Sequence, residues 1–158
     1  MHKPRLARLA DIHMRQPAYF LTLCTAERKP ILARPSIHTA FQEFCGNARQ
    51  HGVHVGRYVL MPDHAHLFAL FTLGGTSLSI RAKSLKNALS KVWRSEGVPA
   101  PHWQKGFFDH VLRSNDSYSE KCSYVRENPV RAGLAKTPDE WIYQGEIADI
   151  NGRDVRRS

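Results

Sequence analysis

The middle of the chain carries two runs of β-branched and aromatic residues that are separated by a very short polar interruption. The first run extends from Val53 to Met61, and the second extends from His64 to Phe71. Such composition predicts two β-strands. Because only Pro62 and Asp63 separate the runs, we expect the strands to pair as antiparallel neighbours.

Two further segments have the character of strands. The segment Ala18 to Cys24 is rich in aromatic and β-prone residues, and it lies between Pro17 and a charged stretch at 27–30. The segment Phe107 to Leu112 follows Gly106 and has a similar composition. The sequence therefore predicts a first strand at 18–24 and a fourth strand at 107–112.

Three segments have apolar residues at the spacing of a helix. The first begins near Ser36, which we expect to be its N-cap, and ends near Gly52. The second is a long amphipathic segment from Ser77 to Glu96. The third runs from about Asp116 to Glu127, and we expect Pro129 to end it.

The succession of elements is thus β-α-β-β-α-β followed by a helix. This order is typical of an α+β, ferredoxin-like (RRM-like) fold, in which an antiparallel sheet carries helices on one face. With 158 residues the chain has the length of one domain. We expect a basic N-terminal arm at 1–17, the folded domain at 18–143 and a mobile basic tail at 144–158.

The charge of the chain is strongly positive. It contains 23 Lys and Arg against 14 Asp and Glu, which gives a formal net charge of +9 and a pI near 9.8. This excess favours a polyanionic partner such as nucleic acid, although a basic protein without such a partner is an open alternative. An anionic membrane surface is less favoured, because no basic amphipathic helix with aromatic anchors is evident.

The sequence shows no membrane-spanning or secretory segment and no metal-binding cysteine pattern. No apolar run approaches the roughly 18 to 20 residues that cross a bilayer, so we expect a cytoplasmic protein. Cys24, Cys45 and Cys122 are widely spaced, which predicts neither a disulfide framework nor a zinc knuckle.

His64 and His66 lie one residue apart in the predicted third strand. The period of two places both imidazoles on one face of the sheet, where they could share a divalent metal ion. The chain contains nine histidines, so a pair at this spacing also arises by chance. Two ordinary strand histidines are therefore the alternative interpretation.

Tyr124 lies in the last predicted helix, with Asn128 four positions later on the same face. A tyrosine hydroxyl has a pKa of about 10, so it attacks phosphorus only when a metal polarises the phosphate or a base takes its proton. The alternative is an aromatic side chain packed in the core. Tyr118, on another face of the same helix, is expected to pack or to contact DNA.

Three separated segments resemble one family in sequence, order and spacing. They are Met61 to His66, Trp103 to Arg113 and Tyr124 to Leu134. Together they resemble the REP-associated tyrosine transposases, a branch of the single-tyrosine HUH transposases, over roughly residues 15 to 143.

The resemblance implies a site and a reaction. It implies that the last helix lies over the sheet beside His64 and His66, that these two residues and Asn128 bind the metal, and that Tyr124 is the nucleophile. The amide oxygen of Asn128 suits Mg²⁺ or Mn²⁺. The implied reaction is transesterification of single-stranded DNA, with a 5′-phosphotyrosine intermediate, a free 3′-hydroxyl and later strand transfer.

The resemblance also implies a bacterial, nucleoid-associated protein that binds hairpin-forming repeat DNA, as a monomer or as a homodimer. We expect contacts to DNA from a set of basic and aromatic residues: Arg5, Arg15, Lys83, Lys86, Trp103, Phe107 and Arg113. Trp103 and Phe107 could equally belong to the core, and the two lysines could form a solvated helix face. His110 lies in a matched segment without an assigned role.

Three other functions remain open at this point. The first is a repeat-DNA-binding protein that no longer cleaves and has a structural or regulatory role. The second is an RNA-binding module, because a similar sheet serves RNA recognition. The third is a hydrolase that activates water, in which Asp63 could be a metal ligand.

Overall fold

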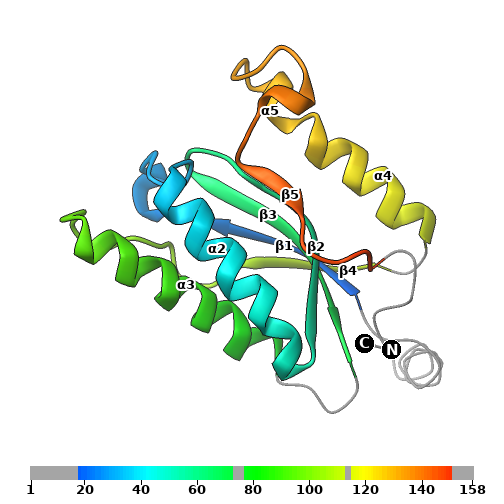
Figure 1. The fold of residues 1–158 in the computed structure, drawn as a ribbon, viewed down its shortest axis with the longest axis horizontal. Helices are drawn as coiled ribbons and strands as arrows, with labels where there is room; N and C mark the ends of the chain where they lie inside the picture. The colour runs from blue at the N-terminus through cyan, green and yellow to red at the C-terminus, as the bar shows by residue number, and fades with distance from the viewer. Residues whose placement is uncertain (1–17, 73–76, 113–114, 151–158) are drawn as a thin grey trace.

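A computed structural model of the chain shows a single antiparallel sheet with helices on both of its faces (Figure 1). The structure describes residues 18–72, 77–112 and 115–150, without the side chains of 115–117. Within these residues the strand order is β4-β1-β3-β2-β5. The strands are β1 (Ala18–Cys24), β2 (Val53–Leu60), β3 (His64–Phe71), β4 (Phe108–Leu112) and β5 (Gln144–Glu146).

The four predicted strands form where the sequence pattern places them. β2 and β3 pair as antiparallel neighbours around Pro62 and Asp63, and the amide of Met61 donates to the carbonyl of His64 at 2.8 Å. β1 lies between β3 and β4 and pairs antiparallel with both. The first four strands therefore have the order of a ferredoxin-like sheet, as expected.

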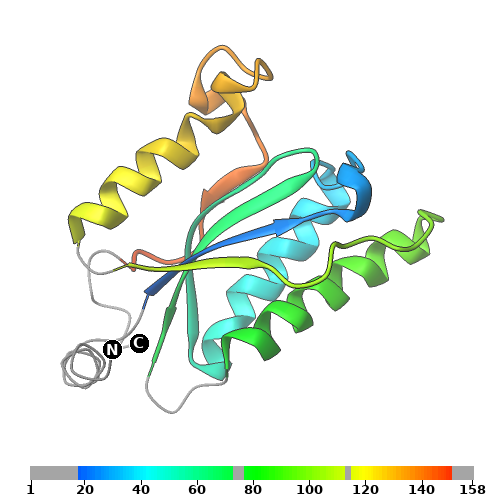
Figure 2. The same cartoon turned by 180° about the vertical axis from the view of Figure 1, so that it is seen from behind.

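The helices α2 (Pro35–Asn47) and α3 (Leu78–Ser95) cover one face of the sheet side by side (Figures 1 and 2). The main core lies between these helices and the sheet. Its largest side chains include Trp93, Phe41 and Tyr58. Trp93 is buried together with its polar atom, since its indole nitrogen donates to the carbonyl of Ile31 at 3.0 Å.

The starts of these two helices differ from the sequence prediction in one respect. Ser77 caps α3, because its hydroxyl accepts a hydrogen bond from the amide of Ile80 at 3.1 Å. Ser36 does not cap α2: Arg34 is the N-cap residue and Pro35 is the first helical residue. Proline suits that position because the first helical amide has no partner within the helix.

The helix α4 (Asn115–Arg126) covers the opposite face of the sheet. A second hydrophobic cluster joins it to the strands and contains Val59, Met61, Phe68, Leu70, Tyr118, Val125 and Ile150. The expectation of helices on one face thus holds for α2 and α3, while α4 lies over the other face, as the family resemblance implied. The packing role expected for Tyr118 is confirmed.

The C-terminal end of the description confirms one predicted boundary and corrects another. The helix α4 ends at Arg126, close to the predicted end at Glu127, and Pro129 lies early in a separate short helix, α5 (Asn128–Arg131), where an amide hydrogen is not needed. The tail expected at 144–158 begins too early, since β5 pairs with β2 and Ile150 is buried. The predicted arm at 1–17 and residues 151–158 lie outside the described residues.

Among the helices that the structure describes, none combines the length and the apolar character needed to cross a lipid bilayer.

The stability of the fold should fall as the solution becomes mildly acidic, in part because of His38. Its Nε2 lies 2.7 Å from the hydroxyl of Tyr58, and burial lowers its pKa below the ordinary value. Below an unfolded-state pKa of about 6.5, the unfolded chain therefore binds more protons than the folded chain, which favours unfolding. We expect urea midpoints to decrease between about pH 7 and pH 5, and to decrease less in a His38→Gln variant. Equal slopes for the two proteins would contradict this role.

Candidate active site

The two histidines of β3 share one face of the sheet, as the alternation predicted. Their neighbour Ala65 is buried on the opposite face, beneath α2 and α3. The ring centroids of His64 and His66 lie 4.8 Å apart, with the ring planes at 73°. Across the strand pair, His66 is opposite Thr22 and His64 is opposite Cys24.

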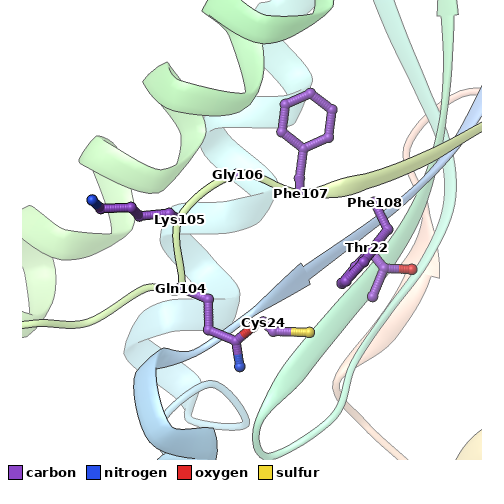
Figure 3. Close-up of a pocket in the computed structure, with 7 residues that line it drawn as sticks. All are labelled: Thr22, Cys24, Gln104, Lys105, Gly106, Phe107 and Phe108. Carbon is purple, nitrogen blue, oxygen red and sulfur yellow. The ribbon is translucent and has the colours of Figure 1, made fainter.

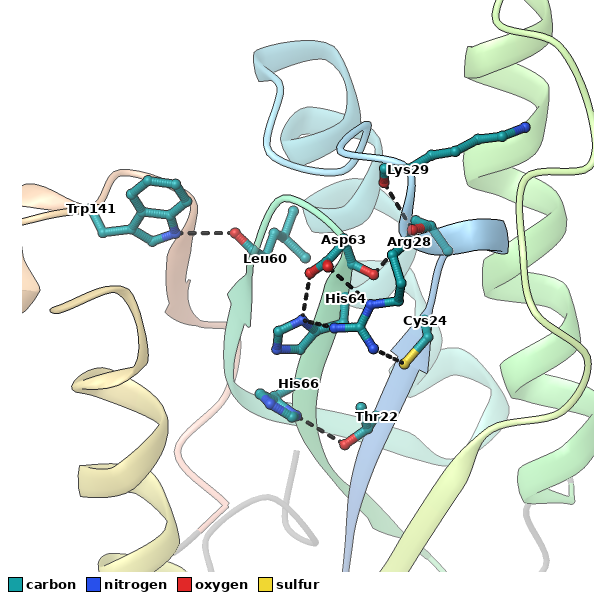
Figure 4. A network of polar contacts seen from close by, with 10 residues as sticks. Thr22, Cys24, Arg28, Lys29, Leu60, Asp63, His64, His66 and Trp141 are labelled. Atoms are coloured by element: carbon teal, nitrogen blue, oxygen red, sulfur yellow. Dashed lines mark hydrogen bonds and ion pairs between the residues drawn. The ribbon is translucent and has the colours of Figure 1, made fainter. Parts of the chain in front are cut away.

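The Nδ1 atom of each imidazole is held by a neighbouring side chain (Figure 4). His64 Nδ1 lies 2.9 Å from the carboxylate of Asp63, and His66 Nδ1 lies 2.9 Å from the hydroxyl of Thr22. With the ring proton on Nδ1, the lone pair on each Nε2 is available, and no residue in the described ranges bonds to it. Histidines that bind metals are typically held in this way. The donor set therefore fits a divalent metal ion.

Asp63 supports the histidine pair and is itself held by Arg28. One carboxylate oxygen accepts from Arg28 Nε at 2.9 Å, and the other accepts from His64. Although burial acts in the opposite direction, these hydrogen bonds keep the pKa of Asp63 below its ordinary value. Each carboxylate oxygen thus accepts a hydrogen bond, which makes Asp63 a partner that orients His64.

His66 is the more enclosed of the two imidazoles. Its ring stacks on Phe20 with centroids 5.1 Å apart. Burial, together with the positive charges of His64, Arg131 and Lys121, lowers the pKa of His66 to about 4. The ring is therefore neutral at pH 7, which is the protonation state that a metal ligand requires.

Tyr124 lies on α4, on the same side of the sheet as the histidines, with its side chain 59% exposed. Lys121, almost one turn earlier on the helix, has its ammonium 5.4 Å from the ring of Phe20. Because Phe20 stacks on His66, this flank of α4 lies close to the histidine pair. The exposure of Tyr124 excludes the alternative that it is a core residue.

Arg131 is a site residue that the sequence analysis did not identify. Its guanidinium carbon lies 3.7 Å from the centroid of the Tyr124 ring, and its Nη2 donates to the carbonyl of Tyr124 at 2.8 Å. The short helix α5 thus folds back onto α4 and brings a cation to the tyrosine. The only sequence signal was the position of Arg131 within the third matched segment.

Asn128 begins α5, where its side chain is partly exposed. The backbone at Glu127 remains near helical, with φ −82° and ψ −6°, so Asn128 follows Tyr124 by about one turn. In the described part of the chain, no three residues of the types His, Cys, Asp and Glu gather as a metal cluster. Asn128 as the third ligand stays a prediction.

Two of the residues expected to contact DNA support the loop before β4. The ammonium of Lys86 donates to the carbonyl of Gln104 at 2.9 Å and also to that of Gly106, and burial lowers the pKa of Lys86. Trp103 packs on Trp93 with ring centroids 5.2 Å apart, and its indole nitrogen donates to the carbonyl of Lys86 at 3.1 Å. These contacts give both residues a structural role.

The other expected DNA contacts lie away from the histidine pair or outside the description. Phe107 packs against the main core, which matches the alternative that it is a core residue. Lys83 is exposed on α3, and this helix covers the sheet face opposite the histidines. Arg5, Arg15 and Arg113 lie outside the described residues. Contact of all these residues with DNA stays a prediction.

Sequence comparison finds two relatives with informative names. The chain is 24% identical over 96 residues to a REP-associated tyrosine transposase of Escherichia coli, which covers 61% of this chain and 56% of that protein. It is 22% identical over 149 residues to a Haemophilus influenzae protein provisionally named as a REP-associated tyrosine transposase, which covers 84% of this chain and 81% of the relative. The chain thus spans little more than half of the E. coli protein. No protein-family profile matches it.

Structural comparison agrees with the sequence comparison. A REP-associated tyrosine transposase bound to a REP hairpin superposes with a TM-score of 0.68 at 22% identity, covering 90% of this chain and 81% of that chain. The resemblance to REP-associated tyrosine transposases is confirmed. A Deinococcus radiodurans protein provisionally described as a transposase has a TM-score of 0.52 at 18% identity, covering 71% and 90% of the two chains. The fold is therefore the α+β fold of REP-associated tyrosine transposases.

The position of α4 over the histidines should depend on Gly56 in β2. A Cβ atom at this position would lie 2.9 Å from both Tyr118 Oη and Ile150 Cδ1, so in Gly56→Ala these two buried side chains of the second cluster must shift. We expect Gly56→Ala to lower the free energy of unfolding by ~1–3 kcal/mol and to speed amide hydrogen exchange in α4. Gly46→Ala on α2 is the matched control, because a Cβ there meets nothing within 4 Å. Unchanged exchange in α4 of Gly56→Ala would contradict this dependence.

Proposed function

We propose that this protein is a metal-dependent nuclease and strand transferase of the transposase type, acting on single-stranded, hairpin-forming repeat DNA through Tyr124. The observation that carries the proposal is the histidine pair, in which each Nδ1 contacts a neighbouring side chain and each Nε2 is available. The pair lies on the sheet face that α4 covers, and α4 carries the exposed Tyr124. The similarity to REP-associated tyrosine transposases supports the same function.

In this proposal His64 and His66 hold Mg²⁺ or Mn²⁺ through Nε2, with Asn128 as the third protein ligand. The bound ion would neutralise negative charge on the phosphate that is cleaved. Asp63 and Thr22 keep the two rings oriented toward the ion, and the low pKa of His66 keeps that ring neutral.

Tyr124 supplies the nucleophile. Its Oη forms a bond to phosphorus while the bond from phosphorus to the 3′ oxygen breaks, so the DNA is left with a 5′-phosphotyrosine link and a free 3′-hydroxyl. The phenol proton passes to water, and the departing 3′ oxygen takes up a proton from water. Because one phosphodiester replaces another, a different 3′-hydroxyl can reverse the step and join a new strand.

Several cations surround the proposed reaction centre. Arg131 lies on the ring of Tyr124, Lys121 lies over Phe20 beside His66, and Arg28 pairs with Asp63. Arg131 orients the tyrosine through both the ring contact and the carbonyl hydrogen bond. Positive charge of this density suits a DNA backbone and agrees with the net charge of +9.

The RNA-binding alternative loses its main support. RNA-recognition modules of similar topology stack bases on an open face of the sheet. Here α4 packs on that face, and Tyr118 and Val125 are buried against it. A DNA-binding protein that does not cleave remains an outcome that the first experiment below separates from the proposal.

The nucleophile can be tested by trapping the covalent adduct. Wild-type protein incubated with labelled hairpin DNA and Mn²⁺ should give a protein–DNA adduct that survives denaturation, and Tyr124→Phe should give none, since it lacks the attacking oxygen. Tyr19→Phe is the matched control, because Tyr19 packs against Phe71 on the other face of the sheet.

An adduct with Tyr124→Phe would refute the assignment of the nucleophile. Binding of hairpin DNA by the wild type without any adduct would favour the non-cleaving alternative.

The metal site can be tested without cleavage by calorimetric titration with Mn²⁺. His66→Ala should abolish measurable binding, because one of two imidazole ligands is lost. Asp63→Asn should weaken binding by ~10–100-fold, since the amide holds the His64 ring less firmly. His51→Ala, an exposed histidine before β2, should bind Mn²⁺ like the wild type. Equal binding by His66→Ala and the wild type would refute the site.

A further inference from the structure

A shallow pocket of about 160 Å³ opens beside the histidine pair, between β1 and the loop before β4 (Figure 3). Its lining includes Thr22 and Cys24 from β1, Gln104 and Gly106 from the loop, and Phe108 from β4. None of the residues for which the sequence predicted metal binding or nucleophilic attack belongs to this lining. The pocket is thus a separate feature that adjoins the proposed reaction centre.

Thr22 links the pocket to the metal site. Its hydroxyl binds His66 Nδ1 at 2.9 Å, and the same residue lines the pocket. In the sheet, Thr22 is opposite His66 on one side and opposite Phe108 on the other. Two strand spacings, or about 10 Å, therefore separate the backbones of His66 and Phe108. A nucleotide next to a phosphate at the histidines can bridge that distance.

Phe108 is the most exposed large aromatic side chain in the described residues, at 68%. Its pairing with Thr22 puts it on the histidine face of the sheet, whereas the ring of Phe107, which also lines the pocket, turns the other way and packs against the main core (Figure 3). An aromatic ring left open to solvent beside a cationic site provides a stacking surface for an unpaired base.

The loop that forms the other wall is held in place. The ammonium of Lys86 binds the carbonyls of Gln104 and Gly106, and the amide of Gln104 donates to the carbonyl of Cys24 at 3.0 Å. Gly106 has φ +71°, a left-handed conformation that turns the chain sharply toward β4. The carboxamide of Gln104 combines donors and an acceptor, as recognition of a base edge requires.

We propose that this pocket binds one unpaired nucleobase next to the cleaved phosphate, with Phe108 as the stacking surface and Gln104 as the group that reads the base edge. The inference rests on the proposed function, because it takes single-stranded DNA at the histidine pair as its starting point. In this proposal the loop before β4 contributes to substrate selection, and Lys86 and Trp103 hold that loop in place.

The test measures affinity for hairpin oligonucleotides with unpaired flanks, in Mg²⁺ and without cleavage, using Tyr124→Phe as the background. Each flank position is replaced in turn by an abasic sugar. At one position the abasic sugar should reduce affinity roughly 10-fold, the loss expected for one stacked base. Phe108→Ala should lose a similar factor with intact DNA and should show no further loss with the abasic sugar. Phe108→Trp should restore both the affinity and the abasic effect.

Gln104→Ala tests the second half of the proposal. Four oligonucleotides that differ only in the base at the sensitive position are compared. The affinities of Gln104→Ala for these four should differ less than the affinities of the parent protein do. The same abasic loss in Phe108→Ala as in the parent protein would overturn the proposal, as would the absence of any sensitive position. Phe108 is largely exposed, so its variants should keep the thermal unfolding of the parent.

These outcomes are distinct from failure of the proposed function. If the wild type forms no adduct through Tyr124, or if it binds no Mn²⁺, the proposed function fails. DNA affinity can still be measured, so the effect of Phe108→Ala on the abasic loss can still be tested. Conversely, if the abasic sugar reduces affinity equally in the parent protein and in Phe108→Ala, only the proposed base pocket is refuted. If the parent protein binds no hairpin or single-stranded DNA at all, both the proposed function and this inference fail.

Discussion

The packing of α4 on the second face of the sheet is the interaction on which the candidate site depends. Tyr118, Val125 and Ile150 are buried there, and the absence of a side chain at Gly56 allows Tyr118 and Ile150 to approach β2 closely. Without this contact, the histidines would face solvent and Tyr124 would have no defined position. A second, smaller hydrophobic cluster thus connects two halves of a site that are sixty residues apart in sequence.

The polar part of the site follows a simple electrostatic arrangement. Two imidazoles with fixed orientations are surrounded by the cations Arg28, Lys121 and Arg131, and the carboxylate nearest to them, Asp63, is engaged by Arg28 and His64. Positive charge near His66 and burial of its ring both oppose protonation. The positive charges of Arg28, Lys121 and Arg131 would also attract a phosphate, while the neutral state of the His66 ring is what the proposed metal ion would require.

The loop before β4 connects α3 and the main core to the candidate site. Lys86 on α3 holds the loop through two carbonyls, and Trp103 packs on Trp93 in the main core. These residues belong to the type that binds nucleic acid, which is why their sequence context suggested direct contact. In the structure their donors and rings shape the loop, and the exposed ring on the histidine face of β4 belongs to Phe108.

The sequence by itself determined the four long strands, the three long helices, the shared face of His64 and His66 and the resemblance to REP-associated tyrosine transposases, because periodicity and contiguous motifs are local properties. Only the tertiary structure decided which neighbouring phenylalanine faces the site, since that depends on the register of β4 against β1. It also decided the strand β5, whose three residues are too few for a pattern and are stabilised by the edge of β2. The role of Arg131 was also decided by the tertiary structure, because its contact with Tyr124 requires the chain to turn back at α5.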